Sequence, residues 1–312
     1  MRFFDNKNQN KWEMSCIMHL NKRLLLFTLM LFFLNFANCY ANVNYTGVPV
    51  LMYHNFIVGD SYEGATISKY QFETEMQYLY ENGYETITPK ELLDYMNNKR
   101  VLNPRSVLIT MDDGYESNYL IAYPILKKYG FKATQFTIVS KIDSTPPMYY
   151  SKHCTSQQMK EMSDVFTFQS HTFDLHDVGP GNYPVSLSAS TAQVYEDLSL
   201  AALTLKSLGY EQYAFSYPFG RSNGRIKSVL KSMGISMAFN INPGRVFQNT
   251  NRLMIPRNNV SNTTTLDEFK KIVDPDPLKK YPTKVKKRPP LASDDIPKIT
   301  PTNNTYEDTK SK

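Results

Sequence analysis

Cysteine and tryptophan are scarce in this chain of 312 residues, which has three cysteines and the single tryptophan Trp12. Removal of the first 41 residues would leave Cys154 as the last cysteine. A single thiol cannot form an internal disulfide. We therefore expect the fold to be held by its hydrophobic core and by any metal that it binds.

The excess of positive over negative charge is also modest, with a formal net charge of +6. Much of the excess lies in one C-terminal segment, so the net charge says little about the folded part and does not point to nucleic acid. We expect no nucleic-acid partner, and we expect the protein to be a monomer.

The N-terminus has no apolar run of the ~20 residues that a membrane span needs. It has a shorter run, from Leu24 to Leu34, preceded by Lys22-Arg23 and followed by Cys39-Tyr40-Ala41. This is the pattern of a secretory signal peptide. We predict a leader over residues 1–41 and a secreted, cell-surface or periplasmic protein. Retention of the leader as an anchor remains the alternative.

Strand and helix patterns alternate from residue 48 to residue 239. Apolar, β-branched-rich runs predict strands at 48–53, 107–111, 133–139, 165–169, 213–216 and 236–239. Between them, helical spacing predicts helices near 72–80, 89–95, 122–129, 157–162, 189–208 and 226–233. Strands that alternate with helices indicate an α/β fold with a parallel sheet or barrel.

The chain changes character after residue 268. Proline–acid pairs, the basic cluster Lys284–Arg288 and a polar C-terminal stretch show no periodicity. We predict a folded domain over 42–268 and a disordered tail over 269–312. The basic cluster is a candidate for weak contact with an anionic cell surface.

Three motifs follow predicted strands directly. Asp112-Asp113-Gly114 follows the run that ends at Met111, His171 and His176 follow the run that ends at Gln169, and residues 217–220 (Tyr-Pro-Phe-Gly) follow Ser216. In parallel α/β folds the functional groups gather at the carboxyl ends of the strands. We expect the three motifs to meet in one pocket.

Two imidazoles and one carboxylate, with one position left for water, form a standard catalytic zinc arrangement. A second carboxylate outside that set can accept a proton from the water. The adjacent pair Asp112 and Asp113 suits this division, and Gly114 allows the chain to turn there. The motifs therefore predict a hydrolytic metal site.

The motifs resemble those of the polysaccharide deacetylases, the NodB-homology family of carbohydrate esterases. Ile109–Tyr115 resembles the first motif of that family, Ser170-His171-Thr172 with the later His176 resembles the second, and Phe215–Gly220 resembles the third. The opening run Val48–His54 is similar to the entry strand of many members. The resemblance covers about residues 48–260.

The resemblance implies a distorted (β/α) barrel with fewer than eight repeats. It makes Asp113, His171 and His176 the metal ligands and Asp112 the catalytic base. The implied reaction is hydrolysis of an N-acetyl group on an amino sugar, which releases acetate. The implied cofactor is a divalent metal, and Zn²⁺ is the leading candidate. The same ligand set also accepts Co²⁺, Ni²⁺ or Fe²⁺.

Three departures from the family pattern stand out. The two histidines are five residues apart, which is similar to the branch that acts on poly-N-acetylglucosamine. Ser216 stands where many members carry an arginine, so we expect the usual network around the base to be absent. No histidine follows His176, so the late histidine that many members use as a general acid is missing.

His54 is our candidate for a further catalytic residue, because it too follows a predicted strand. Asp174 is a candidate to orient a ligand imidazole. The candidates for substrate binding are Tyr115, Tyr217, Pro218, Phe219 and Arg257.

We therefore expect a metal-dependent N-deacetylase whose partner is an N-acetylated polysaccharide, foremost the poly-β-1,6-N-acetylglucosamine of biofilms. One alternative is a peptidoglycan or chitooligosaccharide deacetylase. Another is a non-catalytic polysaccharide-binding module on the same fold, which would release no acetate.

Overall fold

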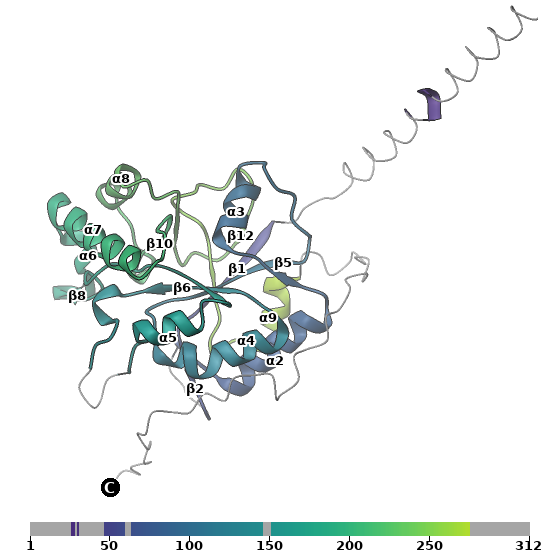
Figure 1. The fold of residues 1–312 in the computed structure, drawn as a ribbon, viewed down its shortest axis with the longest axis horizontal. Coiled ribbons are helices and arrows are strands. Elements are labelled where there is room, and N and C mark those ends of the chain that lie inside the picture. The colour runs from purple at the N-terminus through teal and green to yellow at the C-terminus, as the bar shows by residue number, and fades with distance from the viewer. Residues whose placement is uncertain (1–25, 29, 31–46, 60–63, 146–150, 275–312) are drawn as a thin grey trace, which may run out of the picture. The chain divides into compact units, whose positions relative to one another are not determined.

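The computed structural model describes residues 26–28, 30, 47–59, 64–145 and 151–274 (Figure 1). Contacts divide the chain into one unit over residues 1–45 and another over residues 46–312. In the first unit, described residues 26–28 are helical and exposed. The predicted cleavage site after Ala41 and the basic cluster Lys284–Arg288 lie outside the described residues. Within the described residues, no helix is long and apolar enough to cross a membrane.

The second unit is built on a sheet whose order is β11-β10-β7-β6-β5-β1-β12. The neighbours from β11 through β1 are all parallel pairs. Two further strands flank this path: β13 pairs in parallel with β1, and β4 pairs in parallel with β5. Within this sheet, β12 is the one described strand that is antiparallel to its partner. This is the distorted (β/α) barrel with fewer than eight repeats that the sequence predicted.

The strands of this sheet are β1 (Val48–Tyr53), β4 (Glu85–Thr86), β5 (Ser106–Met111), β6 (Ala133–Thr137), β7 (Phe166–Ser170), β10 (Ala214–Ser216), β11 (Met237–Phe239), β12 (Arg245–Val246) and β13 (Asn258–Asn259). β1 and β5 are buried at every position. Continuous apolar runs suit strands that are covered on both faces. Two small pairs lie outside the sheet, β2 (Asn55–Ile57) with β3 (Thr66–Ser68), and β8 (Val178–Gly179) with β9 (Tyr183–Pro184).

The α-helices are α2 (Lys69–Glu81), α3 (Pro89–Met96), α4 (Tyr123–Tyr129), α5 (Ser156–Glu161), α6 (Val185–Ser188), α7 (Thr191–Ser207), α8 (Gly224–Ser232) and α9 (Leu266–Val273). Short turns of other helix types are η1 (Asn118–Ala122), η2 (Val139–Lys141), η3 (Pro180–Asn182) and η4 (Pro218–Gly220). The predicted helix over 189–208 begins later than expected, because Ser190 is extended and caps α7.

Helices α2, α4, α5 and α9 share one hydrophobic cluster with β1, β5 and β7 (Figure 1). Helices α7 and α8 pack with β10 in a second cluster. Phe72, Met76 and Leu79 of α2 are fully buried, as their helical spacing predicts. The packed faces hold the strand ends, and hence the motif loops, in fixed positions.

The folded region extends past the predicted boundary at residue 268. Phe269 and Val273 of α9 are fully buried. Beyond them, the Asp274 carboxylate accepts hydrogen bonds from the hydroxyls of Tyr78 (3.0 Å) and Tyr84 (2.6 Å). The prediction of disorder from residue 269 is wrong for 269–274, because this short amphipathic helix completes the cover over α2. The rest of the predicted tail lies outside the described residues.

Candidate active site

The three motifs lie together at the carboxyl ends of β5, β7 and β10. Each contains a non-glycine residue with left-handed backbone: Asp113 (φ 70°), Thr172 (φ 78°) and Phe219 (φ 56°). This region is sterically costly, above all for a β-branched residue such as Thr172. Gly114 (φ 83°) must also be glycine, since a Cβ there would lie 2.9 Å from Cγ2 of Thr137. The surrounding packing holds all three turns in shapes that they would not adopt alone.

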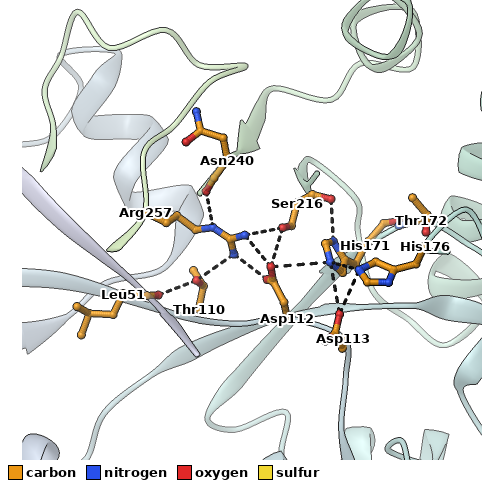
Figure 2. Close-up of polar contacts among 11 residues, drawn as sticks. Leu51, Thr110, Asp112, Asp113, His171, Thr172, His176, Ser216, Asn240 and Arg257 are labelled. Carbon is orange, nitrogen blue, oxygen red and sulfur yellow. Dashed lines mark hydrogen bonds and ion pairs between the residues drawn. The ribbon is translucent and has the colours of Figure 1, made fainter. Parts of the chain in front are cut away.

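Asp113, His171 and His176 bring their ligand atoms to one point (Figure 2). The Nε2 atoms of the two histidines are 3.0 Å apart. Asp113 Oδ1 lies 3.5 Å from His171 Nε2 and 3.3 Å from His176 Nε2. Two imidazoles and a carboxylate in this arrangement match a three-residue metal site with open positions.

The protonation states of this cluster suit a cation. His171 Nδ1 lies 2.8 Å from the Ser216 carbonyl oxygen, so Nδ1 carries the proton and the Nε2 lone pair faces the cluster. Burial lowers the pKa of His171 to about 3 and also lowers that of His176. Burial, with the charge of Asp112, raises the pKa of Asp113 to about 6. Asp113 Oδ1 is buried and accepts no hydrogen bond from the described residues. These donor atoms fit a divalent metal.

Asp112 lies beside the cluster but is held differently. Its Oδ1 accepts from Arg257 Nη1 at 2.7 Å, and its Oδ2 accepts from Arg257 Nη2 at 2.6 Å and from Ser216 Oγ at 3.0 Å. Its Oδ2 is 3.8 Å from His171 Nε2. Burial alone would raise the pKa of Asp112, but the Arg257 guanidinium, with His171 and His54, holds it well below its usual range. The carboxylate is therefore ionised at neutral pH.

Arg257 is itself enclosed, with 0% of its surface exposed. Its Nε donates to the Asn240 carbonyl at 2.9 Å, and its Nη1 lies 3.3 Å from Thr110 Oγ1 (Figure 2). A buried, bidentate pair of this kind is wholly committed to its partner. The usual network, with an arginine at position 216, is absent as expected, but Arg257 supplies another from a different part of the chain. Because the Arg257 side chain is fully buried and paired with Asp112, its assignment to substrate binding is wrong.

The residues of the third motif, 217–220, differ in their exposure. Tyr217 is fully buried, and its hydroxyl donates to the Leu253 carbonyl at 3.0 Å. Pro218 is buried as well. Neither side chain can stack on a sugar, so the prediction that they bind substrate is wrong. Phe219 remains available: it is 38% exposed, and its ring lies 4.8 Å from that of His176.

His54 and Tyr115 also lie close to the two aspartates. His54 follows β1 and is near enough to lower the pKa of both Asp112 and Asp113. Its Nδ1 atom is buried and has no hydrogen-bond partner among the described residues. A hydrogen bond from the Tyr115 side chain lowers the pKa of Asp113. On its other side, Tyr115 stacks on His153 with ring centres 5.2 Å apart.

Sequence reasoning missed one residue, Asp197 on α7. Its carboxylate, rather than that of Asp174, supports the loop between the two histidines. Asp174 instead accepts a hydrogen bond from Ser140 Oγ at 2.6 Å, so it orients neither imidazole. The missed signal was an acidic residue within the apolar stripe formed by Val194, Leu198 and Ala201.

The barrel and its cluster of polar groups at the strand ends define the chain as a barrel hydrolase. Comparison with known proteins then shows which family of hydrolases the chain belongs to. The family model described as polysaccharide deacetylase matches residues 99–238. A Bacillus subtilis (strain 168) protein, YxkH, provisionally named a polysaccharide deacetylase, is 33% identical over 218 residues, which are 69% of this chain and 71% of that protein. The chain belongs to the polysaccharide deacetylase family.

Other relatives lie within the same family. The poly-β-1,6-N-acetyl-D-glucosamine N-deacetylase of Staphylococcus aureus (strain MSSA476) is 32% identical over 195 residues, covering 62% of this chain and 67% of that protein. The structure of IcaB from Ammonifex degensii aligns with a TM-score of 0.63 at 28% identity, over 73% of this chain and 95% of that one. The deacetylase PplD of Streptococcus pyogenes, solved with acetate, aligns with a TM-score of 0.63 at 26% identity, over 73% of this chain and 98% of that one.

Proposed function

We propose that this protein removes N-acetyl groups from poly-β-1,6-N-acetylglucosamine and releases acetate. The observation that carries the proposal is the cluster of Asp113, His171 and His176 beside an ionised, arginine-held Asp112. The substrate is supported by the named activity of the Staphylococcus aureus relative. The five-residue spacing of the two histidines agrees with that choice.

Asp113, His171 and His176 would hold a divalent metal, Zn²⁺ in the first instance. Such a cation supplies Lewis acidity toward a water and the acetamide carbonyl. The three residues supply one carboxylate oxygen and two neutral nitrogens. Co²⁺, Ni²⁺ and Fe²⁺ accept the same donors, so the metal found in the cell depends on supply as well as on geometry.

Asp112 is the proposed general base. Three donor atoms, from Arg257 and Ser216, occupy about three of the four lone-pair sites that a carboxylate offers. The remaining site can accept a proton from the attacking water. The fixed guanidinium prevents the carboxylate from rotating, so the acceptor stays aimed at the same point.

His54 is the proposed general acid. Its imidazole lies close to both aspartates, and its buried Nδ1 atom has no partner within the described part of the chain. Cleavage of the amide C–N bond leaves an amine nitrogen that needs a proton. An imidazole at the end of β1 can deliver that proton, whereas no histidine follows His176 in the sequence.

Phe219 and Tyr115 are the remaining candidates to contact the sugar. The half-exposed ring of Phe219 covers His176 and offers an apolar face. We also propose export through a leader over residues 1–41, action at the cell surface or in the periplasm, and a monomeric protein. Weak contact of Lys284–Arg288 with an anionic surface would keep the enzyme near its polymer.

The test measures acetate release from poly-β-1,6-N-acetylglucosamine by the purified protein with Zn²⁺ and with a chelator. Asp112→Asn is compared with Asp267→Asn, which makes the same change at an exposed residue of α9. We expect metal-dependent release that Asp112→Asn abolishes and Asp267→Asn leaves unchanged. Release only from peptidoglycan or chitin oligomers would show that one of these polymers is the substrate instead. No release from any of these polymers, despite bound metal, would favour a binding module.

A further inference from the structure

The loop between the two histidines is held by one distant carboxylate. Residues 172–175 connect His171 to His176, and Asp197 accepts hydrogen bonds from three consecutive backbone N–H groups of this loop. Phe173 N donates to Oδ2 at 2.9 Å, and Asp174 N and Leu175 N donate to Oδ1 at 2.8 and 3.1 Å. Bonds from backbone N–H groups to an ionised carboxylate are among the stronger hydrogen bonds in proteins.

Asp197 is not a surface residue that happens to be nearby. It lies on the inner face of α7 and is only 8% exposed. Burial of an ionised carboxylate is costly unless its oxygens are satisfied. The three loop N–H groups provide that compensation, so the helix and the loop stabilise each other.

The opposite edge of the loop is held by η2. Val139 N donates to the Thr172 carbonyl at 3.1 Å, and Ser140 N donates to the Phe173 carbonyl at 2.9 Å. The loop is therefore clamped on its carbonyl side by η2 and on its N–H side by Asp197. Removal of the carboxylate would leave three adjacent N–H groups without their acceptor, on one side only.

The two histidines depend on this clamp to different degrees. His171 has anchors of its own: its backbone N donates to the Thr137 carbonyl at 2.8 Å, and its Nδ1 bonds the Ser216 carbonyl. The His176 ring contacts the cluster itself, its own backbone and Phe219, and the charges of Asp177 and Lys141 also act on it. The position of His176 is therefore set mainly by the loop backbone.

We propose that Asp197 is a positioning residue for metal binding, which acts by capping residues 173–175 and thereby placing His176 against Asp113 and His171. The inference rests on the proposed metal role of these three residues. It assigns to a residue of α7, outside all three motifs, control over one ligand of the site. Support of a ligand from outside the coordinating set commonly changes metal affinity by about 10–100-fold.

The experiment compares Asp197→Ala and Asp197→Asn with Glu196→Ala, which removes an exposed carboxylate from the neighbouring position of the same helix. Zn²⁺ affinity is measured by competition with a chromophoric chelator, and the ligand geometry by the visible spectrum of the Co²⁺ form. We expect about a tenfold or greater loss of affinity for Asp197→Ala. Asp197→Asn keeps one carbonyl acceptor and should lose less, and Glu196→Ala should bind as the wild type does.

Hydrogen exchange in the metal-free proteins provides the second measurement. We expect the amides of residues 173–175 to exchange at least tenfold faster in Asp197→Asn than in the wild type, while those of β6 keep their protection. Unchanged exchange, or an unchanged Zn²⁺ affinity in a folded Asp197 variant, would overturn the inference alone. Failure of the wild type to bind metal would overturn the proposed function as well. If Asp197→Ala does not fold, Asp197→Asn decides the matter.

Discussion

Two adjacent aspartates divide the site into halves with opposite physical character. Asp112 is largely satisfied: a guanidinium and a hydroxyl fill about three of its four acceptor positions, and its pKa is held low. Asp113 is left incomplete, with a buried oxygen that accepts no hydrogen bond from the described residues and a pKa raised by burial to about 6. These adjacent residues therefore differ in their partners: Asp112 faces the cation of Arg257, whereas Asp113 Oδ1 faces two neutral imidazoles.

The difference shows where each half obtains its counter-charge. Arg257 gives Asp112 a permanent cation within the chain, so the base is ready before substrate arrives. Asp113 and the two neutral imidazoles offer three donors that face the same point. The half around Asp113 is complete only when a cation joins it.

The largest effect on stability should come from breaking the ion pair between Arg257 and Asp112. Arg257→Met leaves Asp112 buried without its cation, and we expect a loss of about 3–5 kcal/mol in the free energy of unfolding. The measurement is urea unfolding of the metal-free protein. The double variant Arg257→Met/Asp112→Leu removes both charges and should regain much of that stability. A single variant that unfolds like the wild type would refute the importance of the pair.

His54→Gln should lower kcat by about 10²-fold, because it removes the proposed proton donor while it keeps a side chain of similar size. Steady-state acetate release measures kcat, and thermal unfolding checks the fold. His153→Gln is the matched control, since it removes an imidazole that stacks on Tyr115 and has no proposed role in proton transfer. Equal losses in the two variants would count against a specific role for His54.

The same substitution at the two neighbouring aspartates should change stability in opposite directions. Asp113→Asn removes a carboxylate whose charge is disfavoured in the fold, so we expect the metal-free protein to gain ~1–3 kcal/mol at pH 7. Asp112→Asn loses charge pairing and should destabilise. Urea unfolding of both variants without metal measures the two changes.

The pH dependence follows the same signs. The raised pKa of Asp113 means that its contribution to stability is present below about pH 4 and is lost as the pH rises to about 6. The lowered pKa of Asp112 means that its contribution is present above about pH 4 and is lost at more acid pH. The contribution of Glu75, whose pKa burial raises to about 8, is also lost over this range in both proteins, so the measurement is the difference between the metal-free wild type and Asp113→Asn. A difference that stays constant between pH 4 and 6 would contradict this account.

The smallest effect should come from removing the exposed ring of Phe219 at the edge of the site. Phe219→Ala removes an apolar face beside His176, and we expect a few-fold rise in KM with about the same kcat. Phe247→Ala is the control, because Phe247 has a similar exposure of 43% but lies outside the motifs. Acetate release over a range of polymer concentrations separates KM from kcat. A change confined to kcat would argue that Phe219 supports His176 rather than the sugar.

Much of the fold could be predicted because its signals are local. Thr88 and Glu91 form a capping box that begins α3, and one short stretch of sequence contains this signal. Gly130 ends α4 with left-handed backbone, as glycine readily does. The meeting of the motifs was also predictable, since strand ends of a parallel sheet share one edge.

The remaining parts of the site depend on contacts that no local pattern contains. The sequence suggested Arg257 as a substrate-binding residue, and only the packing of β13 beside β1 shows that it pairs with Asp112. Tyr217 has an apolar body and a polar tip, so its residue type fits both a sugar platform and a buried hydrogen bond. Helix α9 was missed because a helix of 8 residues offers only two buried apolar positions.

The arginine that fixes the base has a kinetic consequence. Arg257 lies 145 residues from Asp112 along the chain and directly precedes β13, the last strand of the sheet. Contacts of such long range form only after the intervening chain has closed its loops. We therefore expect activity to appear with the slowest folding phase, when the C-terminal part of the chain docks on β1. A chain interrupted before residue 257 would hold the metal ligands and yet lack a working base.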